Sequence, residues 1–373
     1  MKLHVFELER WQSKWENRVQ YNLSESGVHP LKVNELLGDE DVEFLNHSLG
    51  YSQTNGTEEL RKAIAAIYPR ADMENVLVTN GSSEANFVAM WSFLERGVEV
   101  VVMLPNYMQI WGLAKTFQAK VKSFRLRETQ GEWKPDIPAL RRAVGRKTKL
   151  IAVCNPNNPT GAVMREEAVD EICEIAEKVG AWIISDEVYQ GAELDGVAAP
   201  TFWGRYKKAI VVNGLSKAYG LPGLRIGWIV TTRDLADKLW SYHDYTTICP
   251  TPLSDYLARK ALEPEMRAKI LARTRQILRA NLPIIKGWVE SNRESFSFVP
   301  PKAGAIAYMK YNLKINSSQF ADRLLREKST LIVPGDHFGM DGYLRVGYGS
   351  QKEYLTTGLN RISELVEQIK KGL

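Results

Sequence analysis

The sequence KLIAVCNPNNPTG, residues 149–161, joins an apolar run to a turn that two prolines and a glycine make rigid. An apolar run without polar alternation (149–154) is typical of a strand that is buried on both faces of a sheet. The turn follows at the carboxyl end of that strand, where open α/β sheets bind their ligands. This stretch therefore predicts both a parallel sheet and a binding site at its edge.

The same pattern recurs along the central part of the chain. Short apolar runs alternate with segments of helical periodicity, as expected for strands that helices cover on both faces. We therefore predict an α/β fold with a mainly parallel, doubly wound sheet. The other predicted strands are 76–79, 98–104, 181–185, 209–212 and 225–231, and the helices between them include 107–117 and 165–179.

The chain changes character beyond Pro252. A helix-rich stretch continues to about residue 292, and we expect it to break near Pro264 and Pro283 because proline interrupts helices. A final helix is predicted over 352–369. Four short strands are expected between them, at 296–299, 305–309, 331–333 and 343–346.

The start of the chain is expected to belong with this second part. Leu8, Trp11, Trp15 and Val19 recur at helical spacing, which predicts an amphipathic helix that packs on the body of the protein or on a partner subunit. The chain of 373 residues is long enough for two domains. We predict a large domain over 46–270 and a smaller, discontinuous α+β domain made of 1–45 and 271–373.

Composition and charge exclude several function classes. Lysine and arginine number 49 and aspartate and glutamate 44, and the resulting net charge of +5 is spread along the chain, so we expect no nucleic-acid binding. No apolar run approaches the roughly 20 residues that cross a bilayer, and the start lacks the apolar core of a signal peptide. Three cysteines without a CxxC pair suit a reduced compartment. We expect a cytoplasmic protein that does not bind membranes.

Familiar cofactor and catalytic signatures are missing. The sequence has no GxGxxG after a strand, no GxxxxGK[ST], no HExxH and no GxSxG. Its five histidines lie far apart, and each is expected to be structural. We predict no metal site.

Four short segments carry reactive or charged groups near strand ends. An amine beside an arginine suggests a nucleophile with an anion partner, and a carboxylate three residues before a phenol suits a polar ring. An arginine inside an apolar strand needs an anionic partner, either a substrate carboxylate or an acidic residue of its own domain. These segments are Asn155–Gly161, Ser185–Tyr189, Gly214–Arg225 and Tyr343–Val346.

In their order along nearly the whole chain, these segments resemble the class I/II aminotransferases, the fold-type I enzymes that use pyridoxal 5′-phosphate (PLP). The resemblance implies that Lys217 forms the Schiff base with PLP and moves the α-proton, and that Asp186 pairs with the pyridine nitrogen. Asn158 and Tyr189 would donate to the phenolic oxygen of the ring, and Tyr107 would stack on it. Lys217, Asp186 and Tyr189 form the catalytic set.

The resemblance also assigns the phosphate and the substrate. Arg225 would clamp the phosphate, and helix-opening residues would form its cup with backbone N–H groups. Arg345 would grip the substrate carboxylate in a two-bond fork, beside Asn158, and Gly27 lies in a segment that closes over the substrate. The cup residues are Gly81, Ser82 and Ser83, with Ser216 beside the lysine. Tyr51 would reach the phosphate of a neighbouring subunit, which implies a homodimer with shared sites.

One position departs from the family pattern. The family usually has a serine three residues before the lysine, where it contacts the phosphate, but this chain has Gly214. One hydroxyl is therefore missing from the phosphate cup, at a cost of about 0.5–1.5 kcal/mol for a net hydrogen bond.

The function implied is transfer of an amino group from an L-amino acid to a 2-oxo acid. A C–S lyase, a decarboxylase or a cyclising synthase would share the same lysine, aspartate and arginine and stays an alternative. A regulatory or binding module on the same fold is a second alternative, although every member of the catalytic set is present. A dicarboxylate substrate would need a second arginine at the side-chain pocket, and the sequence does not identify one.

Overall fold

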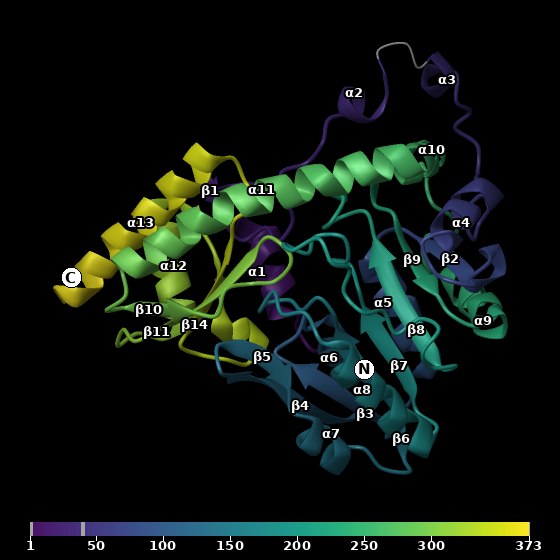
Figure 1. Ribbon diagram of the computed structural model, residues 1–373, viewed down its shortest axis with the longest axis horizontal. Coiled ribbons are helices and arrows are strands. Elements are labelled where there is room, and N and C mark those ends of the chain that lie inside the picture. Colours follow the sequence, from purple (N-terminus) through teal and green to yellow (C-terminus); the bar gives the residue numbers. More distant parts are fainter. Residues whose placement is uncertain (1–2, 39–41, 373) are drawn as a thin grey trace.

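The computed structural model describes residues 3–38 and 42–372, so Met1, Lys2, residues 39–41 and Leu373 lie outside the description below. An eight-stranded sheet forms the centre of the larger part (Figure 1). Its strand order is β2-β9-β8-β7-β6-β3-β4-β5, with parallel pairing from β8 to β4 and antiparallel pairing elsewhere. The strands are β2 (Val76–Thr79), β3 (Glu99–Leu104), β4 (Lys120–Thr129), β5 (Glu132–Pro135), β6 (Thr148–Cys154), β7 (Trp182–Asp186), β8 (Ala209–Gly214) and β9 (Gly227–Val230). The predicted α/β class and mainly parallel sheet are confirmed.

Helices cover both faces of this sheet, as the apolar runs predicted. Successive side chains of β3 alternate between two apolar clusters, with Val100 and Val102 in one and Val101 and Met103 in the other. The first cluster packs under α5 (Ser82–Phe93), α6 (Gln109–Thr116) and α9 (Arg233–His243). The second includes apolar residues of α7 (Ile137–Ala143) and α8 (Glu166–Val179).

Two strands of the large sheet were missed by the sequence analysis. β4 alternates between exposed charged residues such as Arg125 and Arg127 and buried ones such as Phe124 and Leu126. β5 pairs with it antiparallel at the edge of the sheet. Because β4 is exposed on one face, it lacks the continuous apolar run that revealed the central strands.

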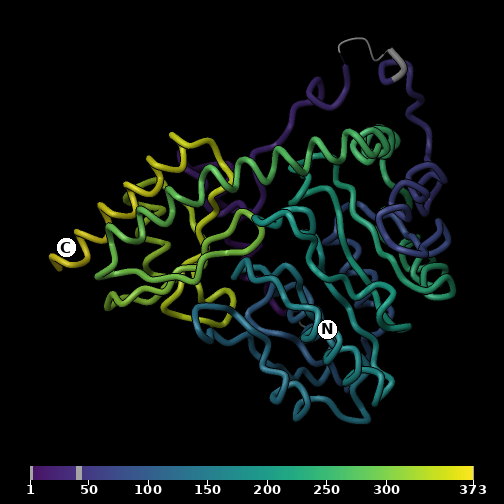
Figure 2. Tube along the Cα trace, viewed as in Figure 1, coloured from purple at the N-terminus to yellow at the C-terminus, as the bar shows by residue number. Residues whose placement is uncertain are grey.

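The smaller part contains a four-stranded antiparallel sheet of order β10-β11-β14-β13. Helices α12 and α13 pack together beside it, and α11 runs along the molecule from α10 to α13 (Figure 1). Figure 2 shows the C-terminus at the far end of α13. The elements are α10 (Pro252–Leu262), α11 (Pro264–Ser291), β10 (Phe296–Phe298), β11 (Ile306–Tyr311), α12 (Ser317–Lys328), β12 (Thr330–Leu331), β13 (Val333–Pro334), β14 (Tyr343–Gly347) and α13 (Lys352–Lys370).

The predicted break at Pro264 is present, but the one at Pro283 is wrong. Helix α10 ends at Leu262 and α11 begins at Pro264, whereas α11 continues through Pro283 to Ser291. Pro283 is exposed, so water can satisfy the carbonyl that loses its N–H partner. Buried residues on either side, Leu278 and Ile285 among them, hold the helix against the body and override the local preference.

The N-terminal segment packs against the smaller sheet. Helix α1 (Glu7–Trp15) donates from Trp11 Nε1 to the carbonyl of Ile332 at 2.8 Å, and β1 (Tyr21–Asn22) pairs parallel with β12. The helix ends before Val19, so the apolar stripe is shorter than predicted. This pairing supports the discontinuous small domain, whose boundaries stay a prediction.

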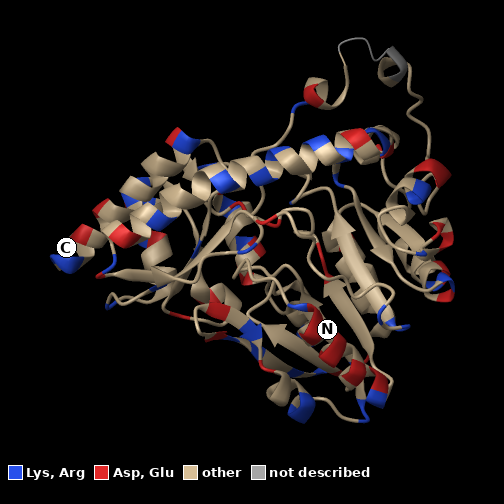
Figure 3. Ribbon diagram, in the orientation of Figure 1, with Lys and Arg blue, Asp and Glu red and all other residues tan. Residues whose placement is uncertain are grey.

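Beyond this segment the chain forms an arm that carries α2 (Val33–Leu36) and α3 (Val42–Leu45), before α4 (Glu58–Ala65) returns to the body (Figure 1). Leu45, Leu49 and Tyr51 on the arm expose about 80% or more of their surface (80%, 78% and 87%). Figure 3 shows lysine and arginine interspersed with aspartate and glutamate over both parts of the molecule. No helix in the described residues is both long and apolar enough to span a bilayer.

Gly347 of β14 provides a test of how the N-terminal segment is held. Its N–H donates to the Leu23 carbonyl at 2.7 Å, and a Cβ there would lie 1.9 Å from the Glu25 carbonyl oxygen. We predict that Gly347→Ala lowers the free energy of unfolding by about 1–3 kcal/mol, because residues 23–25 must shift. Gly287→Ala is the matched control, since nothing lies within 4 Å of its Cβ position on α11. The control should gain about 0.5–1 kcal/mol in chemical denaturation. Equal stability of the two variants would contradict this packing.

Candidate active site

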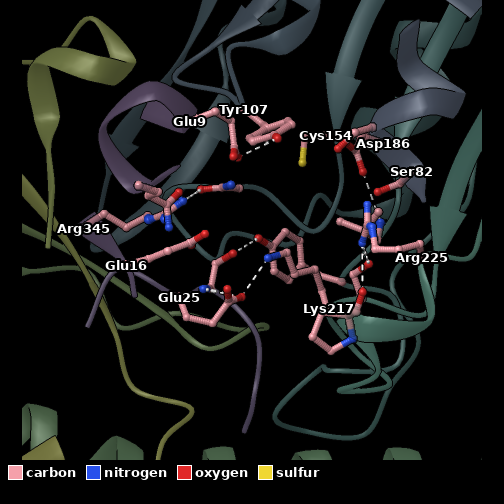
Figure 4. Close-up of a pocket in the computed structure, with 18 residues that line it drawn as sticks. Glu9, Glu16, Glu25, Ser82, Tyr107, Cys154, Asp186, Lys217, Arg225 and Arg345 are labelled. Atoms are coloured by element: carbon pink, nitrogen blue, oxygen red, sulfur yellow. Dashed lines mark hydrogen bonds and ion pairs between the residues drawn. The ribbon is translucent and has the colours of Figure 1, made fainter. Parts of the chain in front are cut away.

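A cavity of about 340 Å³ lies where three parallel strands end. Cys154 and Asp186 are the last residues of β6 and β7, and Ser216 and Lys217 follow β8. The opposite wall comes from the N-terminal segment and from Arg345 of β14. The cavity therefore lies between the two sheets, at the edge of the larger one that the sequence indicated (Figure 4).

Ten of the predicted site residues line this cavity together. They come from six separate stretches of the chain and are Ser82, Ser83, Tyr107, Asn158, Asp186, Tyr189, Ser216, Lys217, Arg225 and Arg345. Gly81 and Gly27 lie just outside it. A Cβ on Gly81 would be 2.3 Å from Arg225 Nη2, and one on Gly27 would be 3.3 Å from the Ser216 carbonyl oxygen. Tyr51 is not brought in, because it lines a separate pocket with Asp255 and Arg259.

Lys217 forms an ion pair with Glu25. Its Nζ donates to Glu25 Oε1 at 2.7 Å, and the same oxygen accepts from the N–H groups of Ser26 and Gly27. Burial disfavours the charged form of both side chains, but the attraction between the ammonium and the carboxylate outweighs this cost. The pKa of Glu25 is lowered to about 2 and the pKa of Lys217 is raised. The pair holds the amine over the cavity.

Asp186 lies on the far side of the cavity from this pair. Burial raises the pKa of its carboxyl to about 6, against hydrogen bonds from Asn86 Nδ2 at 3.2 Å and the Val188 N–H at 3.3 Å. Its carboxylate has no salt-bridge partner among the described residues. A cation placed beside it would restore its charge. Asn86 lies on α5, and the sequence analysis did not identify it.

An anion cradle occupies the same side. Helix α5 begins directly after Gly81, whose φ of 89° suits glycine, so its first N–H groups and the hydroxyls of Ser82 and Ser83 face the cavity. Arg225 reaches the cradle from a left-handed residue with φ 52°, and its Nη1 donates to the Pro222 carbonyl at 3.0 Å. These groups together favour a phosphate.

Close backbone contact explains why Gly214 replaces the usual serine. A Cβ at Gly214 would lie 2.9 Å from the Ile226 carbonyl oxygen and 3.0 Å from Gly227 Cα. Gly227 itself packs on the start of α5, where a Cβ would be 2.3 Å from the Ser82 N. A serine at 214 would therefore require the backbone at 226–227 to shift away from β8, although Gly227 is itself packed on α5.

Arg345 is 1% exposed and forms the other end of the cavity. Its Nη1 donates to Asn158 Oδ1 at 3.0 Å and its Nη2 to the Ser24 carbonyl at 2.6 Å, whereas Nε has no partner within the described chain. None of its partners in that part of the chain is a carboxylate, so an ion pair within its own domain does not explain it. Burial lowers its pKa, which an incoming anion would reverse.

Two tyrosines complete the walls. The Tyr189 hydroxyl donates to Ser26 Oγ at 2.9 Å, and burial raises its pKa to about 12, so it is a neutral donor. The Tyr107 hydroxyl donates to Glu9 Oε1 at 2.8 Å. Both rings therefore touch the N-terminal segment as well as the cavity.

The sequence analysis missed most of the polar residues of that segment. Glu9, Gln12 and Glu16 recur at helical spacing and indicate a polar face, whereas the apolar stripe of the same helix indicated only packing. Glu25 gave no signal, because its approach to Lys217 depends on the fold. The missed lining residues are Glu9, Gln12, Glu16, Glu25, Ser26, Cys154, Val188 and Pro222.

The groups of the site suit a ligand that carries a phosphate, an aromatic ring with a nitrogen, and an aldehyde that can accept an amine. A cradle for the phosphate, a buried carboxylate without a cation and an amine in one cavity match the phosphate, ring nitrogen and aldehyde of PLP. This donor set defines the class of a lysine-dependent PLP enzyme.

Comparison with known proteins identifies the family. The model of "Aminotransferase class I and II" matches residues 43–362. A PLP-dependent aminotransferase from Streptococcus suis superposes with a TM-score of 0.92 at 34% identity over 99% of both chains. The PLP-dependent cyclase OrfR has a TM-score of 0.89 at 27% identity, over 99% of this chain and 98% of the other. Capreomycidine synthase from Streptomyces vinaceus is 30% identical over 96% of this chain and 92% of its own.

The chain belongs to the class I and II aminotransferase family, and its cofactor is PLP. The expected family and cofactor are therefore confirmed. Its relatives include both aminotransferases and enzymes named for other reactions, so the family alone does not specify the reaction.

Asp186→Asn tests the buried carboxylate in the apoprotein. The pKa of Asp186 rises from 3.8 to about 6 on folding, so the folded state binds the extra proton and stability falls as pH rises through this range. Above pH 6 the variant should be more stable than the wild-type apoprotein by up to roughly 3 kcal/mol, and below about pH 4 the two should match. Chemical denaturation at several pH values measures this. An advantage that does not change with pH would contradict the assigned cause.

Proposed function

We propose that this enzyme transfers the amino group of an L-amino acid to a 2-oxo acid. The observation that carries this proposal is the position of Lys217, whose Nζ faces a cavity with Asp186 on one side and Arg345 on the other. When bound, PLP supplies an electrophilic carbon and an electron-withdrawing ring that stabilises charge at the substrate α-carbon. The protein must then orient the substrate and move the proton.

The residues of the site have matching tasks. Asp186 would keep the ring nitrogen protonated, and Tyr189 and Asn158 would hold the ring oxygen. Arg345 would bind the substrate carboxylate with the donors that now face Asn158 and the Ser24 carbonyl. This anchor would place the α-carbon within reach of Lys217, which would accept the α-proton and deliver it to the electrophilic carbon that PLP supplies.

A second candidate is a cyclising synthase with the same cofactor. The similarity to capreomycidine synthase and to the cyclase OrfR favours it. Product analysis separates the two, because an aminotransferase consumes a 2-oxo acid for each amino acid, whereas a cyclase needs no acceptor. The same assay detects a C–S lyase through pyruvate and ammonia, and a decarboxylase through carbon dioxide.

Arg345→Lys tests the carboxylate anchor. Lysine keeps the charge but loses the fork, so one charge-assisted bond of about 1.5–3 kcal/mol is lost. We predict that KM rises for amino acids and 2-oxo acids alike, with kcat/KM reduced about 10- to 150-fold. PLP content, measured by absorbance, should be unchanged. Loss of folding with intact kcat/KM would instead make Arg345 a structural residue.

We also propose a homodimer that shares its sites. Tyr51 lies outside the cavity of its own chain and is 87% exposed, on an arm with other exposed apolar side chains. A partner subunit that covers the arm would bury these side chains. Tyr51 would then lie near the phosphate cradle of that partner subunit.

Subunit mixing tests the shared site. Tyr51→Phe and Lys217→Ala should each impair activity in a homodimer, but their heterodimer contains one site with both original residues. We predict that mixed, refolded chains recover part of the wild-type activity, whereas two Lys217→Ala preparations mixed together recover none. Heterodimers that are shown to form yet stay inactive would contradict the sharing.

A further inference from the structure

The half of the cavity that faces the substrate carries an excess of negative charge. Glu9, Glu16 and Glu25 line the side on which Arg345 lies, whereas Asp186 and Arg225 lie opposite them (Figure 4). A plain L-amino acid brings only one carboxylate to this side, and Arg345 suffices to bind it.

These carboxylates are held in place by the fold. Glu9, Gln12 and Glu16 are spaced by three and four residues, so α1 and its C-cap present them on one face. Gln12 Nε2 donates to Ser24 Oγ at 2.9 Å and to the Ser24 carbonyl at 3.1 Å, which ties this face to the loop after β1 that carries Glu25.

Glu16 is the carboxylate that lacks a partner. Glu9 accepts from Tyr107 and Glu25 from Lys217, but the Glu16 carboxylate makes no hydrogen bond or ion pair within residues 3–38 and 42–372. Burial and the charges of Glu25 and Glu9 raise its pKa. A cation placed near Glu16 would relieve this repulsion.

The residues of the cavity cannot supply that cation. Its cations are Lys217, Arg225 and Arg345, and PLP and the substrate carboxylate would engage all three. The described residues also contain no group of three or more His, Cys, Asp or Glu side chains that could hold a metal ion. The glutamates lie at separate positions along the wall, which suits an extended organic cation better than a metal ion.

We propose that the substrate is an amino acid whose side chain ends in an ammonium or a guanidinium group, which binds against Glu16. Glu9 and Glu25 add attraction from either side, and Gln12 borders the same wall. An acidic side chain such as that of aspartate would be repelled by the same carboxylates. This inference rests on the proposed PLP-dependent function and names its substrate class.

Two pairs of amino acids test the inference on the holoenzyme. L-Arginine and L-citrulline have nearly the same shape but differ in charge, and L-ornithine differs from L-norvaline by its terminal amine. Binding is measured by calorimetry and turnover by product analysis. We expect the cationic member of at least one pair to bind about 10- to 150-fold more tightly, the effect of one charge-assisted bond, and L-aspartate to bind poorly.

Glu16→Gln assigns the effect to this side chain. It should raise KM for the cationic substrate with little change in kcat, and leave KM for the neutral member unchanged. Glu7→Gln is the control, because Glu7 is an exposed residue of the same helix outside the cavity.

The outcomes separate the two proposals. Equal binding within both pairs, or the tightest binding by aspartate, would overturn the cationic side chain while leaving the PLP-dependent reaction intact. A preference that persists in Glu16→Gln would overturn the role of Glu16. If no amino acid alters the cofactor absorbance or is consumed, the proposed function fails, whereas calorimetry still reports on charge selectivity.

Discussion

The ion pair between Lys217 and Glu25 joins residues that lie 192 positions apart and brings together the two halves of the site. Lys217 follows β8 of the large sheet, and Glu25 lies on the segment held by Gly347 of the small sheet. Because an ammonium and a carboxylate that are partly shielded from water are each less favourable alone than as a pair, the ion pair links the two sides of the cavity. The walls of the site are therefore part of how the protein joins its two sheets.

Much of the site could be predicted because it depends on local sequence. Asn158 and Lys217 follow apolar strands and Asp186 ends one, and parallel strands end at one edge of a sheet. Arg345 was visible as a charge in an apolar strand. The expected phosphate cup came from the family resemblance of the helix-opening residues at 81–83.

The parts that escaped prediction depend on tertiary placement. β4 has an edge pattern that resembles a surface segment, and Pro283 is tolerated because neighbouring residues anchor α11. Glu25 and Asn86 act only through partners distant in sequence, at 192 and 100 positions. Gly214 was seen as a missing hydroxyl, but the sequence did not show that packing against Gly227 leaves no room for a side chain.

The position of the N-terminal segment affects how the substrate specificity of such an enzyme can evolve. Apart from Tyr51, the residues that would handle the cofactor lie between 81 and 225, whereas Glu9, Gln12, Glu16 and Glu25 lie within 17 consecutive positions. If Glu16 reads the substrate side chain as proposed, its substitution would alter which side chain is accepted and leave the ion pair of Lys217 with Glu25 in place. New specificity is thus accessible by few mutational steps, and a duplicated copy of the enzyme could diverge in substrate while it retains its chemistry.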